Sequence, residues 1–199
     1  MWQKFKKKLN SLSKKNNGVF TSKEAKEVGI STRTFYRLHA AGKIICISRG
    51  IYQMTECNIS PDYAAIKKRV PNSVICTISA LYHHELTTEI PCCIHLAIQR
   101  DMAIPKIDYP AVKFYRMSPK IFPIGIEQKE IGGIIMNIYT PEKTIVDCFK
   151  YRNTLSLDLA IDSLKKYLES TSNKPSKIYE IAQMCHTGKI IKPYLEALV

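Results

Sequence analysis

The chain has 199 residues, of which 45% are hydrophobic and 24% charged, and its formal net charge is +13. A chain of this length folds as one medium domain or as a small domain followed by a larger one. No segment approaches the ~18 consecutive apolar residues of a membrane-spanning helix. No apolar stretch follows the basic start MWQKFKKKLNSLSKKN, which excludes a secretory signal. We therefore expect a cytoplasmic protein without a membrane partner.

The positive charge is concentrated in the first 57 residues. This segment holds twelve Lys or Arg and three Glu, a net charge of +9, whereas residues 58–199 hold eighteen basic and fourteen acidic residues, a net charge of +4. A short segment with this density of positive charge attracts a polyanion. Nucleic acid is the expected partner; an acidic membrane surface and a merely basic surface are the alternatives.

The seven cysteines indicate no structural framework. None of them forms a CxxC pair, and Cys92 is adjacent to Cys93, which suits neither a zinc knuckle nor an ordinary disulfide scaffold. We expect reduced thiols, as in a cytosol.

Three helices are predicted at the start of the chain. The first spans residues 4–15, where apolar residues recur on one helical face. Thr21 begins the second, with Glu24 three residues later at the spacing of a capping box. Ser31 begins the third, which runs to about Ala41.

The second and third helices have the pattern of a helix-turn-helix. Ala25 is small enough to lie where two helices cross. Gly29 falls in the turn, where a residue without a Cβ adopts a positive φ at little cost. The apolar residues around them are spaced to face inward, which allows the sharp crossing of this motif.

The opposite face of the third helix is polar. Thr32, Arg33, Tyr36 and Arg37 recur at spacings that form one stripe. Arginine bonds guanine O6 and N7, and threonine and tyrosine contact phosphates or base edges. The residues that we expect to contact DNA from this helix are Ser31, Thr32, Arg33, Thr34, Tyr36 and Arg37.

A β-hairpin is predicted next. Its strands are Ile44–Ile47 and Ile51–Met54, and they are joined by Ser48-Arg49-Gly50. A hairpin at this place is the wing of a winged helix-turn-helix, and we expect Lys43, Ser48 and Arg49 to contact phosphates or the minor groove. We assign residues 1–57 to this DNA-binding domain.

Residues 58–199 are expected to form a larger, mixed α+β domain. A polar segment that ends at Pro61 marks its start. Strands are predicted at 93–99, 111–117 and 130–139, with a bend or bulge at Gly132-Gly133. The predicted helices are 61–70, 77–87, 141–150, 156–170, 175–186 and 190–198.

The sequence resembles the AbiEi-type antitoxins, which are transcriptional regulators in viral-defence loci. The helix-turn-helix followed by AAGKI and ISRGIY resembles their N-terminal domain. The stretches TISALYHHELTTEIP, IHLAI and YTPEKTIVDCFKYR look like their C-terminal domain, in the same order. The resemblance implies a bacterial type IV toxin–antitoxin system. The protein would bind and repress its own operator, and its C-terminal domain would counter a nucleotidyltransferase-like toxin.

Two alternatives remain open. One is a stand-alone transcriptional regulator without a toxin. The other is a nucleic-acid-modifying enzyme that uses Glu142, Lys143 or Asp147. We expect instead that Glu142 lies near the positive end of a helix that begins at Thr140-Pro141 and that Asp147 bonds a neighbouring group. We therefore expect no catalytic residues and no cofactor.

A metal site is not expected either. The residues that could suggest one fit no standard zinc spacing. They are His83, His84, Glu85, Cys92, Cys93 and His95.

Overall fold

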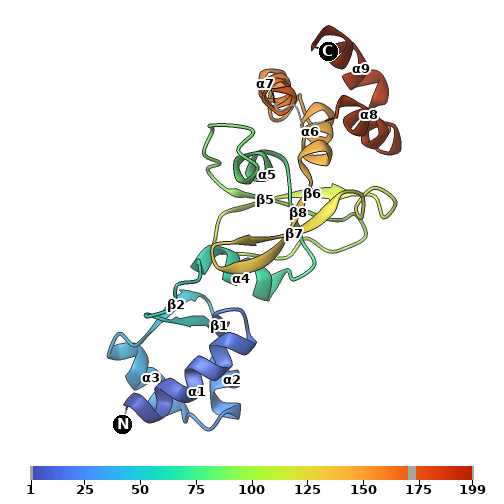
Figure 1. The fold of residues 1–199 in the computed structure, drawn as a ribbon. Coiled ribbons are helices and arrows are strands. Elements are labelled where there is room, and N and C mark those ends of the chain that lie inside the picture. Colours follow the sequence, from blue (N-terminus) through green and yellow to red (C-terminus); the bar gives the residue numbers. More distant parts are fainter. Residues whose placement is uncertain (1, 170–173, 199) are drawn as a thin grey trace. The chain divides into compact units, whose positions relative to one another are not determined.

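A computed structural model describes residues 2–169 and 174–198. The chain forms two compact units (Figure 1). Unit 1 contains the residues up to Asn72 together with 105–111 and 130–136, and unit 2 contains 73–104, 112–129 and 137–199. Helices and two sheets make up the protein, so the predicted α+β class is confirmed. Among the described residues, no helix is long and apolar enough to cross a membrane.

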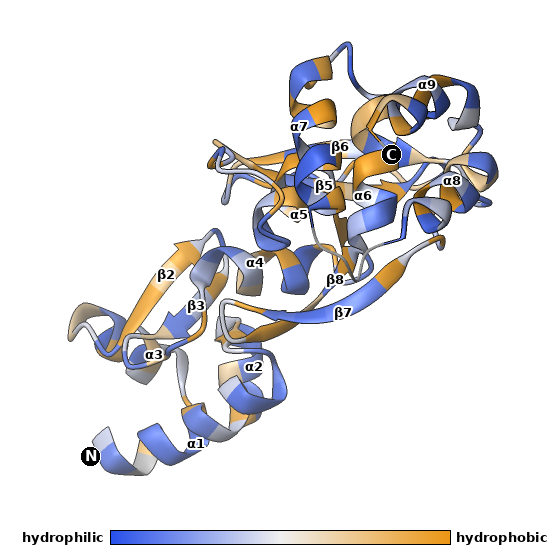
Figure 2. Ribbon diagram, turned by 45° about the horizontal axis from the view of Figure 1, so that its top comes forward, coloured by the Kyte–Doolittle hydropathy of each residue, from blue (hydrophilic) through white to orange (hydrophobic). Residues whose placement is uncertain are grey.

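Unit 1 contains helices and a small antiparallel sheet. The elements follow in the order α1 (Trp2–Lys15), β1 (Val19–Phe20), α2 (Ser22–Glu27), α3 (Thr32–Ala40), β2 (Ile44–Ser48), β3 (Ile51–Met54) and α4 (Pro61–Arg69). The strand order is β1-β3-β2. In Figure 2, β2 is orange along most of its length whereas α1 is largely blue. Only the two end residues of β2, Ile44 and Ser48, are buried, and Ile45 is 40% exposed.

The helix starts in unit 1 follow from capping residues. The capping box is present at α2: Thr21 N donates to Glu24 Oε2 at 2.8 Å, and Glu24 N donates to Thr21 Oγ1 at 3.2 Å. Ser31 is the N-cap of α3. Gly29 adopts a φ of +80° between the two helices. Both helix starts and the turn are therefore placed as the sequence predicts.

One apolar cluster holds the helices and strands of unit 1 together. Phe35 from α3 and Phe20 from β1 are fully buried in it, with ring centroids 6.4 Å apart. Leu9 of α1 and Ala25 of α2 are also fully buried there. Because all of these elements share one core, α3 is held in place by packing against them, and its exposed face has a fixed position in unit 1.

The five-stranded sheet has the strand order β6-β5-β4-β8-β7. Its strands are β4 (Val74–Ile75), β5 (Ile94–Gln99), β6 (Val112–Met117), β7 (Ile126–Ile131) and β8 (Ile134–Tyr139). β4 pairs antiparallel with β5 and parallel with β8, and β5 pairs parallel with β6. The sheet is therefore mixed.

The helices of unit 2 gather around α6. They are α5 (Thr77–His83), α6 (Pro141–Lys150), α7 (Leu157–Leu168), α8 (Pro175–Met184) and α9 (Gly188–Leu198). α6 contacts each of the other four, as Figure 1 also shows. Its residues from Glu142 to Phe149 are all buried, which makes α6 the centre of this core.

Some predicted elements were wrong in detail. The run 130–139 is not one strand with a bend, because Gly132 and Gly133 form a turn between β7 and β8. The helix predicted at 77–87 ends at His83, and the last helix begins at Gly188 instead of residue 190. Strands β1 and β4 were not predicted; each has only two residues. The end of the helix predicted at 156–170 lies outside the described residues.

Candidate nucleic-acid interface

α3 presents one polar face to solvent. Thr32, Arg33, Tyr36 and Arg37 are exposed, Tyr36 by 52%. The residues that alternate with them, such as Phe35, are buried in the core. Exposed and buried residues of α3 thus separate with the period of a helix, and the polar stripe predicted from the sequence lies at the surface.

The first turn of α3 is held by its N-cap. Ser31 Oγ accepts a hydrogen bond from Thr34 N at 3.2 Å and lies 2.9 Å from Thr34 Oγ1. Ser31 is exposed, whereas Thr34 is half-buried. Both hydroxyls are therefore used to order the helix start, and their predicted contact with DNA stays a prediction.

The basic side chains near this face are not paired with acids. Within residues 2–169 and 174–198, neither Arg33, Arg37 nor Arg49 makes an ion pair. Lys43 lies 5.9 Å from the ring centre of Trp2 and is also exposed. Because no carboxylate pairs with the three arginines, they are available to an anionic ligand, whereas Lys43 also interacts electrostatically with Glu56.

The β2–β3 hairpin places its polar residues in two different environments. Arg49 is exposed at the turn. Ser48 is 7% exposed, and its Oγ accepts a hydrogen bond from Arg69 Nη2 at 3.1 Å. The pairing register shifts between Cys46 and Ser48, which indicates a bulge beside the turn. Ser48 thus faces the interior of unit 1, and its predicted phosphate contact stays a prediction.

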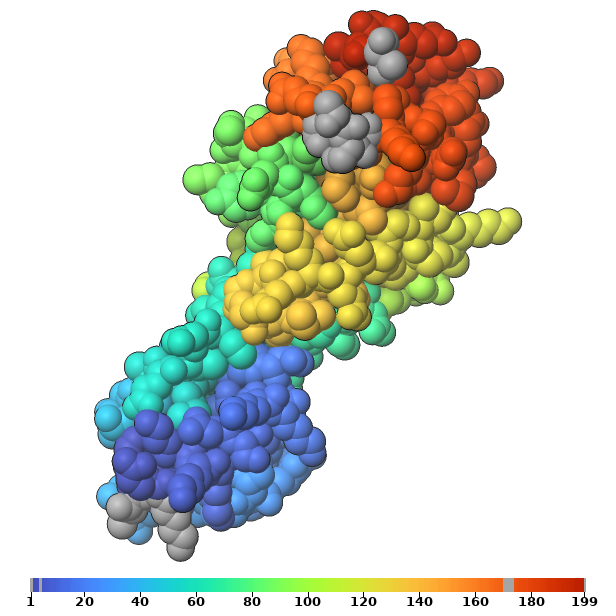
Figure 3. Space-filling view, viewed as in Figure 1, coloured from blue at the N-terminus to red at the C-terminus, as the bar shows by residue number. Residues whose placement is uncertain are grey.

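Two basic residues of α4 were not singled out from the sequence. Lys68 pairs with Glu24 of α2, and Arg69 bonds the β2–β3 turn. Lys68 lies 44 positions after Glu24 in the chain, and Arg69 lies 20 and 21 positions after its two partners. Local sequence spacing therefore gave no signal for these contacts. In Figure 3 the N-terminal part of the chain, which holds α1 to α4, is coloured from dark blue to cyan-green.

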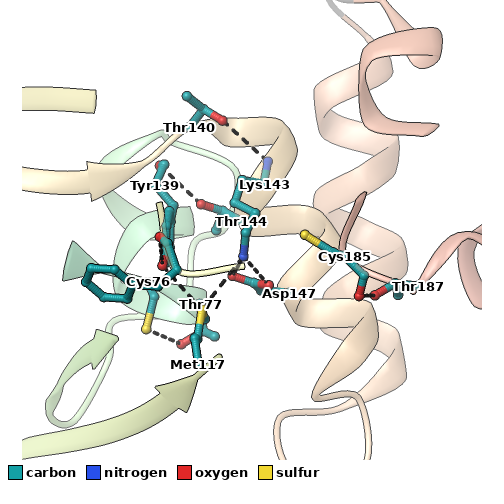
Figure 4. A network of polar contacts seen from close by, with 11 residues as sticks. Cys76, Thr77, Met117, Tyr139, Thr140, Lys143, Thr144, Asp147, Cys185 and Thr187 are labelled. Atoms are coloured by element: carbon teal, nitrogen blue, oxygen red, sulfur yellow. Dashed lines mark hydrogen bonds and ion pairs between the residues drawn. The ribbon is translucent and has the colours of Figure 1, made fainter. Parts of the chain in front are cut away.

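The residues considered for catalysis are buried in unit 2. Lys143 and Asp147 are both fully buried, and Lys143 Nζ lies 2.5 Å from Asp147 Oδ1 (Figure 4). Lys143 Nζ also lies 4.3 Å from the ring centre of Tyr139. Burial raises the pKa of Asp147, while the ammonium of Lys143 opposes this rise. The expected bond from Asp147 to a neighbouring basic group is present, and both side chains are shielded from solvent.

One carboxylate oxygen of Glu142 has partners as well, whereas Glu142 Oε2 is buried without a hydrogen-bond partner among the described residues. Its Oε1 accepts from Tyr167 OH at 3.0 Å and pairs with Lys177 Nζ at 2.8 Å. Burial opposes ionisation of Glu142, but the bonds from Lys177 and Tyr167 and the backbone outweigh it and lower its pKa. It also lies in the first turn of α6, as predicted. The three acidic and basic residues of this segment therefore bond to one another or to other residues of unit 2.

The histidines considered for metal binding have other partners. His84 Nε2 lies 2.7 Å from Tyr139 O, and His95 Nδ1 lies 2.7 Å from Thr77 Oγ1. Burial lowers the pKa of both, that of His95 to about 4. Within the described ranges, no three His, Cys, Asp or Glu residues are grouped as a metal site requires.

Comparison with protein families gives a match at the N-terminal end of the chain. Residues 7–55 match the family described as "Transcriptional regulator, AbiEi antitoxin". This segment is therefore similar to the AbiEi antitoxin family. The match contains α2, α3 and the β2–β3 hairpin, so the AbiEi resemblance stated for these residues is confirmed. The C-terminal stretches that look like the AbiEi family lie outside the match.

One solved structure shows the same fold at low sequence identity. It is the crystal structure of the RV2827C protein from Mycobacterium tuberculosis, with a TM-score of 0.51 and 13% identity. The likeness covers 94% of this chain and 79% of that chain. A search of curated proteins gave no match.

Proposed function

We propose that the protein is a transcriptional repressor whose N-terminal domain is a winged helix-turn-helix that binds double-stranded operator DNA. The observation that carries the proposal is the exposed face of α3, whose two arginines have no acidic partner among the described residues. It lies in the segment 1–57, which carries a net charge of +9. The AbiEi match over residues 7–55 agrees with a regulatory role.

In this proposal α3 is the recognition helix and the β2–β3 hairpin is the wing. Arg33, near the start of α3, reads base edges in the major groove, and Thr32 and Tyr36 contact bases or phosphates. Arg49 at the hairpin turn binds phosphate or enters the minor groove. Lys43 precedes β2 and adds a phosphate contact.

The DNA-binding proposal is tested with DNA from upstream of the gene that encodes the chain. Wild-type protein should bind this DNA more tightly than a scrambled duplex of equal length in a fluorescence anisotropy titration. Arg49→Ala should weaken binding to both duplexes and lower the slope of log K against log salt by about one unit. Lys166→Ala, which removes an exposed cation from unit 2, is the matched control and should change neither quantity. Equal wild-type affinity for the two duplexes would contradict operator recognition.

We further propose that the protein is the antitoxin of a cytoplasmic type IV toxin–antitoxin system. Residues 58–199 would counter a nucleotidyltransferase-like toxin, directly or indirectly, while residues 1–57 bind the operator. This division is supported by the near-balanced charge of 58–199 and by the family of residues 7–55.

Co-expression of the full chain with a neighbouring nucleotidyltransferase-like gene tests the antitoxin role. The double variant Arg33→Ala with Arg49→Ala should lose operator binding and still restore growth when both genes are read from foreign promoters. Loss of protection at an equal protein level would contradict the division of roles. A locus without such a neighbour would favour a stand-alone regulator.

A further inference from the structure

The end of α4 contacts the first helix of the helix-turn-helix. Lys68 Nζ forms an ion pair with Glu24 Oε1, and both side chains are about one-quarter exposed, 27% and 25%. The other carboxylate oxygen, Glu24 Oε2, accepts from Thr21 N at 2.8 Å. Burial opposes ionisation of Glu24, but Lys68 and Thr21 outweigh it and lower the pKa of the carboxyl. One carboxylate therefore caps α2 and also connects it to α4.

The next residue of α4 contacts the turn of the β2–β3 hairpin. Arg69 Nη2 donates to Arg49 O at 2.9 Å and to Ser48 Oγ at 3.1 Å. The first bond fixes the backbone of the residue whose side chain is exposed at the turn, and the second lies directly beside the bulge. A guanidinium presents several donors in a fixed plane, so it can hold two acceptors of one turn at once.

α4 is itself fixed on the small sheet. Ala64 is fully buried against Val19 of β1 and Ile51 of β3, and Ile47 and Ile59 pack on this cluster. The small side chain of Ala64 lets the helix approach the strands closely. The end of α4 is therefore placed by apolar packing, and Lys68 and Arg69 extend from a fixed position.

We propose that Lys68 and Arg69 are positioning residues for DNA binding, an inference that rests on the proposed function. These two consecutive residues, together the clasp, hold the start of α2 and the hairpin turn in one geometry. The clasp thereby fixes Arg49 relative to α3, so that both reach one duplex. Its two cations are used within the protein and do not neutralise phosphates.

Removal of Arg69 tests the clasp against direct phosphate contact. Arg69→Met should weaken binding of the full-length protein to the upstream DNA about tenfold, the loss of one charge-assisted hydrogen-bonded contact. The slope of log K against log salt should stay at the wild-type value, whereas loss of a phosphate contact lowers it by about one unit. Lys67→Met is the matched control, because it removes the same charge from α4 at a residue without an ion pair in the described chain. It should leave affinity within about twofold of wild type.

Lys68 is tested by a double-mutant cycle with Glu24. Glu24→Gln keeps an acceptor for Thr21 N, so the cap of α2 remains while the ion pair is lost. Lys68→Met and Glu24→Gln should each weaken DNA binding by about threefold, and the double variant should be no weaker than either single variant. Multiplied effects in the double variant would overturn the role of the pair.

A measurement without DNA separates this inference from the proposed function. In Arg69→Met, the amide NMR signals of Ser48, Arg49 and Gly50 should shift and gain hydrogen exchange, while those of α3 stay in place. If the wild type binds the upstream DNA and affinity falls in Arg49→Ala but not in Arg69→Met, the clasp is overturned and the proposed function stays intact. A reduced salt slope in Arg69→Met overturns it as well, because Arg69 would then contact phosphate. Failure of wild-type protein to bind the upstream DNA overturns the proposed function itself.

Discussion

The two units differ in the exposure and pairing of their cations. Arg33 and Arg49 in unit 1 are exposed and have no acidic partner among the described residues. Lys143 in unit 2 is fully buried, lies 2.5 Å from Asp147 Oδ1 and packs over Tyr139. Desolvation makes an unpaired cation very unfavourable in the core, whereas in solvent it costs little and attracts anions. The same type of charge is thus paired inside the core of one unit and left exposed to anions on the surface of the other.

A charged motif in a sequence can be assigned to a binding or catalytic site only when the partners of its side chains in the fold are known. Lys143 and Asp147 are four residues apart and face each other on one turn of α6. From the sequence, Glu142, Lys143 or Asp147 could serve an enzyme or bond neighbouring groups, and the structure pairs Lys143 with Asp147. The clasp residues Lys68 and Arg69 lie between these two cases, because they are partly exposed and yet have partners within the protein.

The largest effect is expected from the buried pair. Asp147→Leu leaves the Lys143 cation without its partner and should lower the free energy of unfolding by about 3–5 kcal/mol. Urea unfolding monitored by circular dichroism measures the change. Adding Lys143→Met to Asp147→Leu should restore most of the loss, because two apolar side chains then replace the ion pair. A single variant within about 1 kcal/mol of wild type would contradict a structural role for the pair.

The second effect is expected from an exposed arginine. Arg33→Ala should leave urea unfolding unchanged but weaken operator binding by up to about 3 kcal/mol and relax base preference. Anisotropy titrations with operator and scrambled duplexes measure both. If the two duplexes weaken equally, Arg33 contacts phosphate and does not read bases.

The third effect concerns the pH dependence of stability. Burial lowers the pKa of His95 from 6.5 to about 4, so the folded state binds fewer protons than the unfolded state. The stabilisation is present above pH 6.5 and is lost as pH falls toward 4. Between pH 7 and pH 5 the free energy of unfolding should therefore fall by about 2 kcal/mol more in wild type than in His95→Gln. Equal losses in urea unfolding at the two pH values would show that His95 is not the group responsible.

The smallest effect separates the two functions of the start of α3. Ser31→Ala removes the N-cap and should cost about 1 kcal/mol of stability. Ser31→Asp keeps a capping oxygen and should unfold at or above the wild-type urea concentration, yet bind DNA more weakly because it adds a negative charge beside Arg33. Unchanged DNA affinity in Ser31→Asp would place the duplex away from this end of the helix.

Elements with local signals were predicted well. Thr21, Glu24 and Ser31 mark helix starts through bonds that span three residues, so the sequence pattern carries the whole interaction. Strands β1 and β4 have two residues each, too few to show alternation. β7 has the polar sequence IEQKEI, which conceals a strand at the edge of the sheet.

The surroundings of the candidate site depend on contacts that no local pattern records. The exposed stripe of α3 follows from helical period, and the sequence predicts it. The burial of Ser48 depends on Arg69, which comes 21 residues later. The turn Ser-Arg-Gly predicts exposed residues, whereas Ser48 ends β2, is buried and accepts a bond from α4.

Gly125 packs directly against Lys143 of the buried pair, which restricts the residue types that position 125 can hold. The residue has a φ of +70°, and a Cβ built on it would lie 2.7 Å from Lys143 Cβ. The aliphatic stem of Lys143 therefore occupies the space that a side chain at position 125 would need. The closest atom is the Cβ of position 143, which every residue except glycine carries, and Thr140 Oγ1 lies 3.1 Å from the added Cβ. Among homologous chains that keep this backbone we therefore expect glycine at position 125 even where the lysine–aspartate pair is replaced, because both the positive φ and the close approach of α6 exclude a side chain.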